Sequence, residues 1–287
     1  MAVVAVTNFA DRLADAVERA QSQLVVGIDP VVEQLPDELR GLAPPEAFRR
    51  FAFGLVDAVA PHVVAVKPQS AFFEALGAEG VRVFEEVCAY ARSAGVLVIA
   101  DAKRGDIGST ARAYAQAFIP LADAVTVNPY LGRDSLEPFV EACRREGAGI
   151  FCLVKTSNPG GADVQDAALA DGRPLWQHVA GLVHELGESL VGDQGLSSVG
   201  AVVGATFPAE IAEARRLLPR TPFLLPGIGA QGGEPADVAA AFGAGPASAL
   251  VSASRSVIYA SRAADWRDAA AVEAERLARE VWHVSSA

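Results

Sequence analysis

The sequence predicts an α/β fold: a closed (β/α)8 barrel of the TIM type, formed by residues 1–287 as a single domain. Eight short, β-branched apolar runs alternate with longer stretches of helical periodicity rich in Ala, Glu and Arg. Such alternation is typical of parallel strands covered by helices. The runs are almost continuously apolar, as expected for strands buried on both faces. An open doubly wound sheet is the alternative, but no G-x-G-x-x-G follows the first run.

The elements follow in chain order. A helix over about residues 8–21 is predicted by the spacing of Phe9, Leu13 and Val17, with Thr7 or Asn8 as its N-cap, and it should pack outside or below the barrel. The linker 157–175 is long and rich in Gly, Asp and Pro, which is typical of an active-site loop rather than a domain boundary. Strands are expected at 24–29, 63–67, 96–101, 124–128, 149–155, 198–205, 222–227 and 248–254.

Composition excludes several classes of protein. The 287 residues carry 24 basic and 35 acidic side chains, so the formal net charge is −11, which argues against a nucleic-acid partner. No run of 18 apolar residues occurs, and the opening MAVVAV lacks a basic leader, so we expect no membrane association. Cys88, Cys143 and Cys152 form no metal or disulfide pattern, and a reducing cytoplasm is the simplest setting.

Polar residues gather where the predicted strands end. Asp29, Lys67, Asp101 and Asn128 close the first four apolar runs. The carboxyl ends of barrel strands line one face, and that face carries catalysis in such barrels. Strand ends also meet water, so a single polar residue there means little. Ionisable groups at the ends of three successive strands favour an active site, whereas Asn128 is as well explained by a place at the barrel rim.

The segment DAKRGDIGSTA carries the densest charge pattern. Asp101 and Lys103 are two residues apart, so a continuing strand points both side chains to the same side. Asp106 follows Gly105, where the chain has turned, so its side chain need not face the same way. With Lys67 from the neighbouring strand, these groups predict an alternating Lys-Asp-Lys-Asp array. An ammonium between carboxylates stays protonated and can deliver a proton. A surface salt-bridge cluster is less favoured, because the adjoining VLVIA belongs in the core.

A phosphate site is predicted after the last two strands. PGIGAQGG at 226–233 supplies closely spaced glycines, which let backbone N–H groups approach an anion. Arg255, after the eighth strand, can bind a phosphate through two nitrogens, and Gln231 can bridge phosphate and base. The loops after strands seven and eight are the common phosphate location in these barrels.

These segments together resemble orotidine 5′-phosphate decarboxylases. The resemblance rests on Asp101-x-Lys103-x-x-Asp106 followed by Ile107, Gly108 and Thr110, and on VGIDP, VKPQSAFFEALG, TSNPG, LLPGIGAQGG and Ser254-Arg255. It covers residues 24–255. KPQSAFFE and the long loop after TSNPG resemble the bacterial longer-chain (type 2) branch. Many members have Gly where Ser254 stands here, but a serine N–H can still donate to phosphate.

The resemblance implies decarboxylation of orotidine 5′-monophosphate (OMP) to UMP and CO2, the last step of de novo pyrimidine synthesis, without cofactor or metal. Lys103 would stabilise and protonate the carbanion at C6, and Asp101 would sit beside the departing carboxylate. Asp106 would complete a neighbouring active site in a homodimer. The remaining residues that the family pattern places on the substrate are Lys67, Asp29, Ile107, Thr110, Ser157, Pro226, Gln231, Gly232, Ser254 and Arg255.

Two other functions stay open on the sequence. A metal-dependent sugar-phosphate decarboxylase or aldolase of the same suprafamily would place Mg²⁺ among the carboxylates. A phosphate- or nucleotide-sensing barrel would bind without turnover. The four histidines and three tryptophans lie in helix-like contexts without metal or base-stacking spacing, and packing is the better interpretation for His62, His178, His184, His283, Trp176, Trp266 and Trp282.

Overall fold

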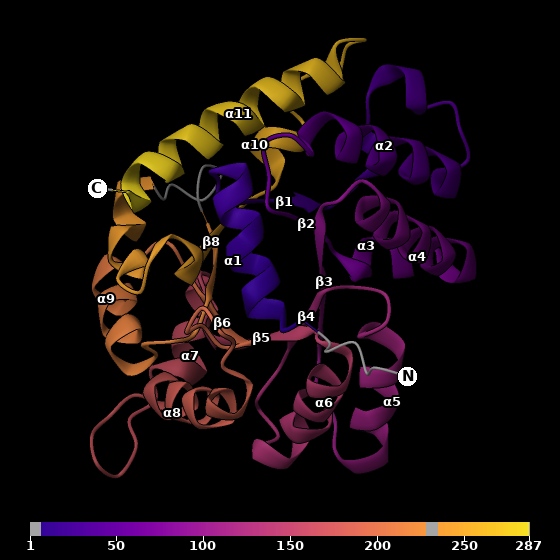
Figure 1. Cartoon of the computed structure of the whole chain (residues 1–287). Helices are drawn as coiled ribbons and strands as arrows, with labels where there is room; N and C mark the ends of the chain where they lie inside the picture. The colour runs from indigo at the N-terminus through magenta and orange to yellow at the C-terminus, as the bar shows by residue number, and fades with distance from the viewer. Residues whose placement is uncertain (1–6, 228–234, 287) are drawn as a thin grey trace, which may run out of the picture.

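Eight parallel strands close into one barrel in chain order (Figure 1). The computed structural model describes residues 7–227 and 235–286. Each strand pairs in parallel with the next, and β8 pairs back with β1, so the predicted (β/α)8 barrel is confirmed. The strands are β1 (Leu24–Ile28), β2 (Ala65–Pro68), β3 (Leu97–Arg104), β4 (Ala124–Val127), β5 (Gly149–Lys155), β6 (Val199–Val203), β7 (Phe223–Pro226) and β8 (Ala249–Ala253).

Helices surround the barrel (Figure 1). After β7 the outer layer is a 3-10 segment, Pro235–Phe242, instead of an α-helix. No helix of the described chain is long and apolar enough to cross a membrane. The α-helices are α1 (Phe9–Ala20), α2 (Pro44–Val59), α3 (Ser70–Glu74), α4 (Gly77–Ser93), α5 (Gly108–Phe118), α6 (Arg133–Glu146), α7 (Ala162–Gln165), α8 (Leu175–Gly187), α9 (Pro208–Leu217), α10 (Arg255–Ile258) and α11 (Trp266–Ser285).

Helix α1 closes the amino-terminal end of the barrel. Asn8 caps it by accepting a hydrogen bond from the backbone N–H of Ala10 at 2.8 Å. Phe9 packs on the first residue of β5, where a Cβ on Gly149 would lie only 2.3 Å from the ring. Phe9 also meets Phe151 edge-on, with ring centroids 6.1 Å apart. With one end filled by apolar side chains of α1, polar chemistry is confined to the carboxyl ends of the strands.

Strand β3 runs further than its apolar run. The predicted strand ended at residue 101, whereas β3 continues to Arg104. The backbone N–H of Asn128 donates to the carbonyl of Arg104 at 2.8 Å, so pairing with the β4 segment resumes beyond a register shift. Strand β5 begins and ends where the sequence predicts.

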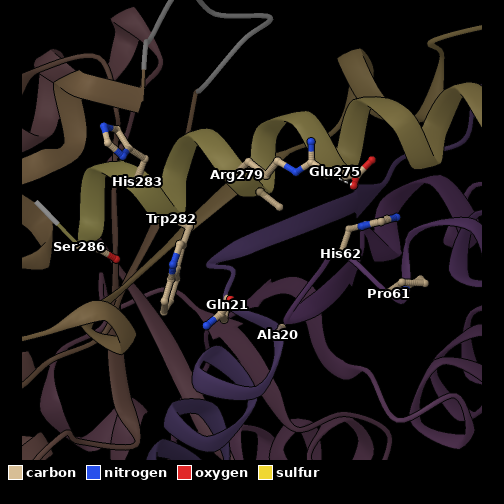
Figure 2. Close-up of a pocket in the computed structure, with 10 residues that line it drawn as sticks. Ala20, Gln21, Pro61, His62, Glu275, Arg279, Trp282, His283 and Ser286 are labelled. Carbon is tan, nitrogen blue, oxygen red and sulfur yellow. Dashed lines mark hydrogen bonds and ion pairs between the residues drawn. The ribbon is translucent and has the colours of Figure 1, made fainter.

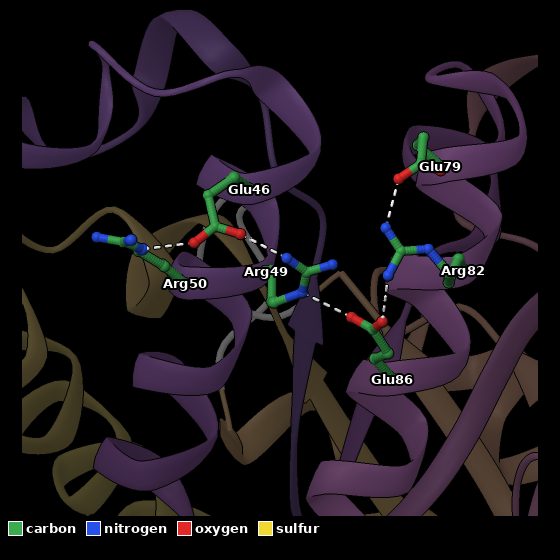
Figure 3. A network of polar contacts seen from close by, with 6 residues as sticks. All are labelled: Glu46, Arg49, Arg50, Glu79, Arg82 and Glu86. Carbon is green, nitrogen blue, oxygen red and sulfur yellow. Dashed lines mark hydrogen bonds and ion pairs between the residues drawn. The ribbon is translucent and has the colours of Figure 1, made fainter.

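An ion-pair network joins the outer helices α2 and α4 (Figure 3). Arg49 on α2 donates through Nε to Glu86 on α4 at 2.6 Å, and Arg82 donates to the same carboxylate at 2.7 Å. Such exposed pairs contribute at most about 1 kcal/mol each, so they align the helices more than they hold the fold. The remaining members of the network are Glu46, Arg50 and Glu79.

Candidate active site

A buried carboxylate lies between two ammonium groups at the carboxyl ends of β2 and β3. Lys67 Nζ donates to Asp101 Oδ2 at 2.6 Å, and Lys103 Nζ pairs with the other oxygen, Oδ1. The side chains of Lys67 and Asp101 are 9% and 7% exposed, whereas that of Lys103 is 44% exposed. The structure therefore brings together three of the four groups of the predicted array, with only the Lys103 amine open to solvent.

The ionisation of this cluster follows from its charges. Burial alone would raise the pKa of Asp101, but the ammonium groups of Lys67 and Lys103 outweigh it and lower the pKa to about 2. Burial alone would lower the pKa of Lys67, but the carboxylates of Asp101 and Asp29 raise it. Asp101 and Lys67 are thus both charged near neutral pH, and the pair presents fixed charges rather than a titrating switch.

Thr126 of β4 holds the backbone that carries Lys103. Its hydroxyl accepts from the backbone N–H groups of Ala102 and Lys103, both at 2.9 Å, and donates to Asp101 Oδ1 at 3.0 Å. Lys103 has φ = 47°, a left-handed conformation that few residues other than glycine adopt. One hydroxyl therefore fixes both the carboxylate and the turn of the chain that aims the amine.

Asp29 lies directly after β1, beside this cluster. Its Oδ1 is buried and has no hydrogen-bond partner among the residues that the structure describes. A Cβ at Gly27 would lie 1.9 Å from Ser254 Oγ and 3.5 Å from Asp29 Oδ1, so only glycine fits here and both predicted site residues meet over it. An unpaired buried carboxylate oxygen is an acceptor suited to a ligand hydroxyl.

Asp106 does not join the cluster within its own chain. Its Oδ1 accepts from the backbone N–H of Ile107 at 2.8 Å, and no ion pair links it to Lys103 or any other described cation. Ile107, 55% exposed, is the N-cap position of α5, and Thr110 lies exposed in the first turn of that helix. Ile107 and Thr110 are therefore exposed beside the array, and Asp106 is half-buried next to them.

The remaining predicted residues lie on the carboxyl ends of β5, β7 and β8. Ser157 is two residues beyond β5, and Pro226 ends β7. Arg255 is exposed at the start of α10 and has no ion pair with a described residue. Gln231 and Gly232 lie outside the described residues.

A cavity of about 790 Å³ opens beside Lys103. Lys103, Asn128 and Thr156 line it near the strand ends, and residues of α8 and of the loop between β5 and α8 line the rest. Trp176, interpreted from the sequence as a packing residue, is buried and also lines this cavity. The half-exposed amine of Lys103 thus faces a space large enough for a small ligand.

A groove of about 530 Å³ lies at the opposite, amino-terminal end of the barrel, between α1 and α11 (Figure 2). His62, Arg279, Trp282 and His283 line part of it. It contains no residue that the sequence pattern assigns to the site. Arg279 is paired with Glu275 on the same helix.

The described cysteines are buried, and the described His, Cys, Asp and Glu side chains form no cluster of the kind that holds a metal. Over residues 7–227 and 235–286, no group of three or more His, Cys, Asp and Glu side chains converges as a metal site. Burial raises the pKa of Cys88 to about 12 and raises those of Cys143 and Cys152 as well, so all three are neutral thiols.

Two residues near the site were not predicted from the sequence. Thr126 lies inside the apolar run AVTVN. A polar residue within a run predicted to be buried is the signal that could have identified it. Lys155 ends β5 as Lys67 and Asp101 end their runs, and it is buried and paired with Asp166. The same strand-end rule that selected Lys67 could have found it.

Comparisons with known proteins agree with this geometry. Residues 22–269 match the model of the Orotidine 5′-phosphate decarboxylase / HUMPS family. An orotidine 5′-phosphate decarboxylase of Rhodopirellula baltica is 48% identical, with 91% of this chain and 95% of that protein covered. A crystal structure from Streptomyces avermitilis has a TM-score of 0.87 at 42% identity, covering 100% of this chain and 99% of the other. The OMP decarboxylase of Leishmania donovani has a TM-score of 0.77 at 35% identity, covering 98% and 100%. The chain therefore belongs to the orotidine 5′-phosphate decarboxylase family.

Proposed function

We propose that the protein converts OMP to UMP and CO2, and that Lys103 stabilises and protonates the carbanion at C6. The family match and the relatives make it an orotidine 5′-phosphate decarboxylase, a carboxy-lyase of pyrimidine biosynthesis. The role of Lys103 is supported by one observation: its half-exposed amine is fixed by a buried, ionised Asp101 at the edge of a ligand-sized cavity.

The chemical step needs positive charge at C6. The bond from C6 to the carboxylate breaks, CO2 leaves, and the electron pair remains on C6. The ammonium of Lys103 stabilises that pair and then transfers its proton to C6, and the neutral amine regains a proton from water. The carboxylate of Asp101 holds the ammonium of Lys103 in place until the transfer, and Lys67 pairs with the same carboxylate from the other side.

The sizes of the energies distinguish two explanations of the rate enhancement: repulsion of the substrate carboxylate, and stabilisation of the carbanion by fixed positive charge. Repulsion between Asp101 and the substrate carboxylate amounts to roughly 4 kcal/mol at 4 Å with an effective dielectric of 20. Proficient enzymes lower barriers by up to about 23 kcal/mol. Repulsion is therefore a minor contribution, and fixed positive charge together with phosphate-driven orientation supplies most of the effect.

The finer assignments are part of the same proposal. Lys67 and Asp29 hold the ribose hydroxyls, which suits the unpaired oxygen of Asp29. Ser157 meets the pyrimidine, and Arg255 binds the phosphate with Gln231, Gly232 and Ser254. Ile107, Thr110 and Pro226 border the ligand. The protein acts in the cytoplasm as a homodimer of one-domain chains of the type 2 branch, with Asp106 shared between subunits.

The ultraviolet absorbance of OMP tests the activity directly. We expect the absorbance to fall when the purified protein is added with EDTA present, with UMP as the product. Turnover that EDTA abolishes would favour the metal-dependent decarboxylase or aldolase. Binding of OMP without any UMP would favour the sensing barrel.

A further inference from the structure

The loop that carries Ser157 is tied at its base by two polar contacts. Lys155, the last residue of β5, forms an ion pair through Nζ with the carboxylate of Asp166, which follows α7. One residue further in, the backbone N–H of Thr156 donates to Gln165 Oε1 at 2.9 Å, and Gln165 Nε2 donates to Thr156 Oγ1 at 2.7 Å. The chain leaving β5 is thus bound to the end of α7, and Ser157 is the first residue beyond these contacts.

The ion pair between Lys155 and Asp166 is buried on the side of the lysine. The side chain of Lys155 is 6% exposed, whereas that of Asp166 is 45% exposed. Asp166 is the one carboxylate within ion-pair distance of Lys155 in the part of the chain that the structure describes, and the amine also lies 6.0 Å from the ring centroid of Phe207. A buried ammonium without a partner is costly. Lys155 therefore holds Asp166, and with it the carboxyl end of α7, against the barrel.

Two glycines allow close packing at the base of this loop. The backbone N–H of Gly204, after β6, donates to the carbonyl of Lys155 at 2.7 Å. A Cβ on Gly204 would lie 2.9 Å from the backbone N and Cα of Ser157. A Cβ on Gly161 would lie 3.0 Å from both Thr156 Oγ1 and Gln165 Oε1. The backbone of Ser157 therefore packs closely against Gly204 after β6, and Gly161 packs closely against the Thr156–Gln165 pair.

The same loop forms a wall of the cavity that reaches Lys103. Thr156, Asn158 and Gln165 line this cavity together with Lys103. A change at the base of the loop therefore alters the space in front of the amine without touching the Lys67–Asp101–Lys103 cluster.

We propose that Lys155 and Asp166 are positioning residues: their buried ion pair, with the Thr156–Gln165 contact, fixes the loop so that Ser157 is presented to the ligand. This inference rests on the proposed function, in which Ser157 meets the pyrimidine. The ion pair acts through Ser157 and makes no contact with the reacting atoms.

A double-mutant cycle tests this role. Asp166→Asn removes the charge but leaves an amide oxygen that can still accept from Lys155 Nζ, so the fold should survive. We expect kcat/KM for OMP to fall about tenfold, mainly through KM, as for the loss of one oriented hydrogen bond. In a Ser157→Ala background, Asp166→Asn should change kcat/KM by less than about twofold, because its effect passes through Ser157. Asp166→Glu should recover most of the loss.

Asp163→Asn is the matched control. It removes the same charge from an exposed residue of α7 that pairs with neither Lys155 nor Thr156, so kcat/KM should stay unchanged. Gln165→Leu gives a second variant with the same expected coupling to Ser157. Wild-type turnover of OMP tests the proposed function separately. Equal losses from Asp166→Asn with and without Ser157, or no loss at all in an active enzyme, would overturn the positioning role.

Discussion

Lys103 adopts a backbone conformation that costs about 1–3 kcal/mol for a residue other than glycine. The Thr126 hydroxyl offsets this cost, because it accepts from the two N–H groups at the turn and also donates to Asp101. A strained backbone conformation that neighbouring groups stabilise is typical of a functional site. Here the strain lets two residues of β3, Asp101 and Lys103, form an ion pair while the chain turns away towards Asp106.

Thr126→Val keeps the size and β-branching of the side chain but removes the hydroxyl. The backbone N–H groups of Ala102 and Lys103 lose their acceptor, so we expect the free energy of unfolding to fall by about 2 kcal/mol and kcat/KM to fall about tenfold. Urea unfolding and steady-state kinetics measure both. Thr126→Ser keeps the hydroxyl and should recover most of each loss. Wild-type kinetics in Thr126→Val would show that the hydroxyl does not position Lys103.

Lys103→Ala removes both the charge that stabilises the carbanion and the proton that C6 receives. We expect kcat to fall by at least about 10³-fold, since one preorganised electrostatic group contributes about 10²–10³-fold and the loss of the proton donor adds to it. UMP binding, measured by calorimetry, should remain detectable, because other residues hold the phosphate and ribose. Near-normal turnover in this variant would end the proposed mechanism.

Asp101 couples stability to acid pH. Its pKa is 3.8 when unperturbed and about 2 in the folded chain. A lowered pKa contributes stability above pH 3.8, and this contribution is lost as the pH falls from about 4 towards 2. The difference corresponds to about 2 kcal/mol. Denaturant unfolding of wild type and Asp101→Asn between pH 3 and pH 7 should show the wild-type advantage shrinking on the acid side. A pH-independent difference would contradict it.

At the scale of elements, the buried guanidinium of Arg215 links α9 to the chain segments that precede β7 and β8. Among the residues that the structure describes, Arg215 of α9 donates to backbone carbonyls alone, at 2.7 to 3.0 Å. Its carbon Cζ lies 3.8 Å from the ring centroid of Phe223. Burial lowers the pKa of Arg215 to about 10, so it is still charged at neutral pH. The acceptors are the carbonyls of Leu218, Thr221, Ala241 and Ser248, which belong to the segments before β7 and β8.

Arg215→Lys should therefore not be a conservative change. A lysine cannot reproduce the planar fork and leaves several carbonyls unpaired, so we expect a loss of about 2 kcal/mol in the free energy of unfolding. The neighbouring Arg216 is exposed and pairs with Glu213 three residues earlier. Arg216→Lys is the matched control and should stay within about 0.5 kcal/mol of wild type. Equal stability of the two variants would show that the carbonyl contacts contribute little.

The strands could be predicted because strands buried on both faces consist of continuous apolar runs. The observed limits of β5, for example, are the predicted ones. The end of β3 could not, since DAKR is polar and its pairing depends on Thr126 and Asn128 from another strand. Lys67 and Asp101 were brought together as predicted because adjacent parallel strands end at one face. The pairing of Lys155 with Asp166 depends on how a loop folds back, which no periodicity records.

At the scale of the whole molecule, the proposed function requires a protein with net charge −11 to bind a doubly charged nucleotide phosphate. Long-range attraction does not help, so binding depends on local cations at the carboxyl face of the barrel. Arg255 stands at that face without an ion pair to any residue in the described ranges, and the Lys103 amine is half exposed. The same face carries Ile107, Tyr130 and Leu131, which are 55%, 79% and 47% exposed. Exposed apolar side chains around a site are typical of a surface that another chain covers.

Subunit mixing tests whether Asp106 serves the partner's site. Lys103→Ala and Asp106→Ala chains, each inactive alone, are unfolded and refolded together. If Asp106 completes the site of the other subunit, each mixed dimer contains one intact site and one dead site. Mixed dimers make up about half of a random assembly, so roughly a quarter of all sites are intact and about a quarter of the wild-type activity returns. If Asp106 acts within its own chain, every site lacks one group and activity stays absent. Mixing Lys103→Ala with Lys103→Arg is the control for recovery by refolding itself. Because Asp106 faces the N–H of Ile107 rather than Lys103 in the single chain, recovery is the expected result.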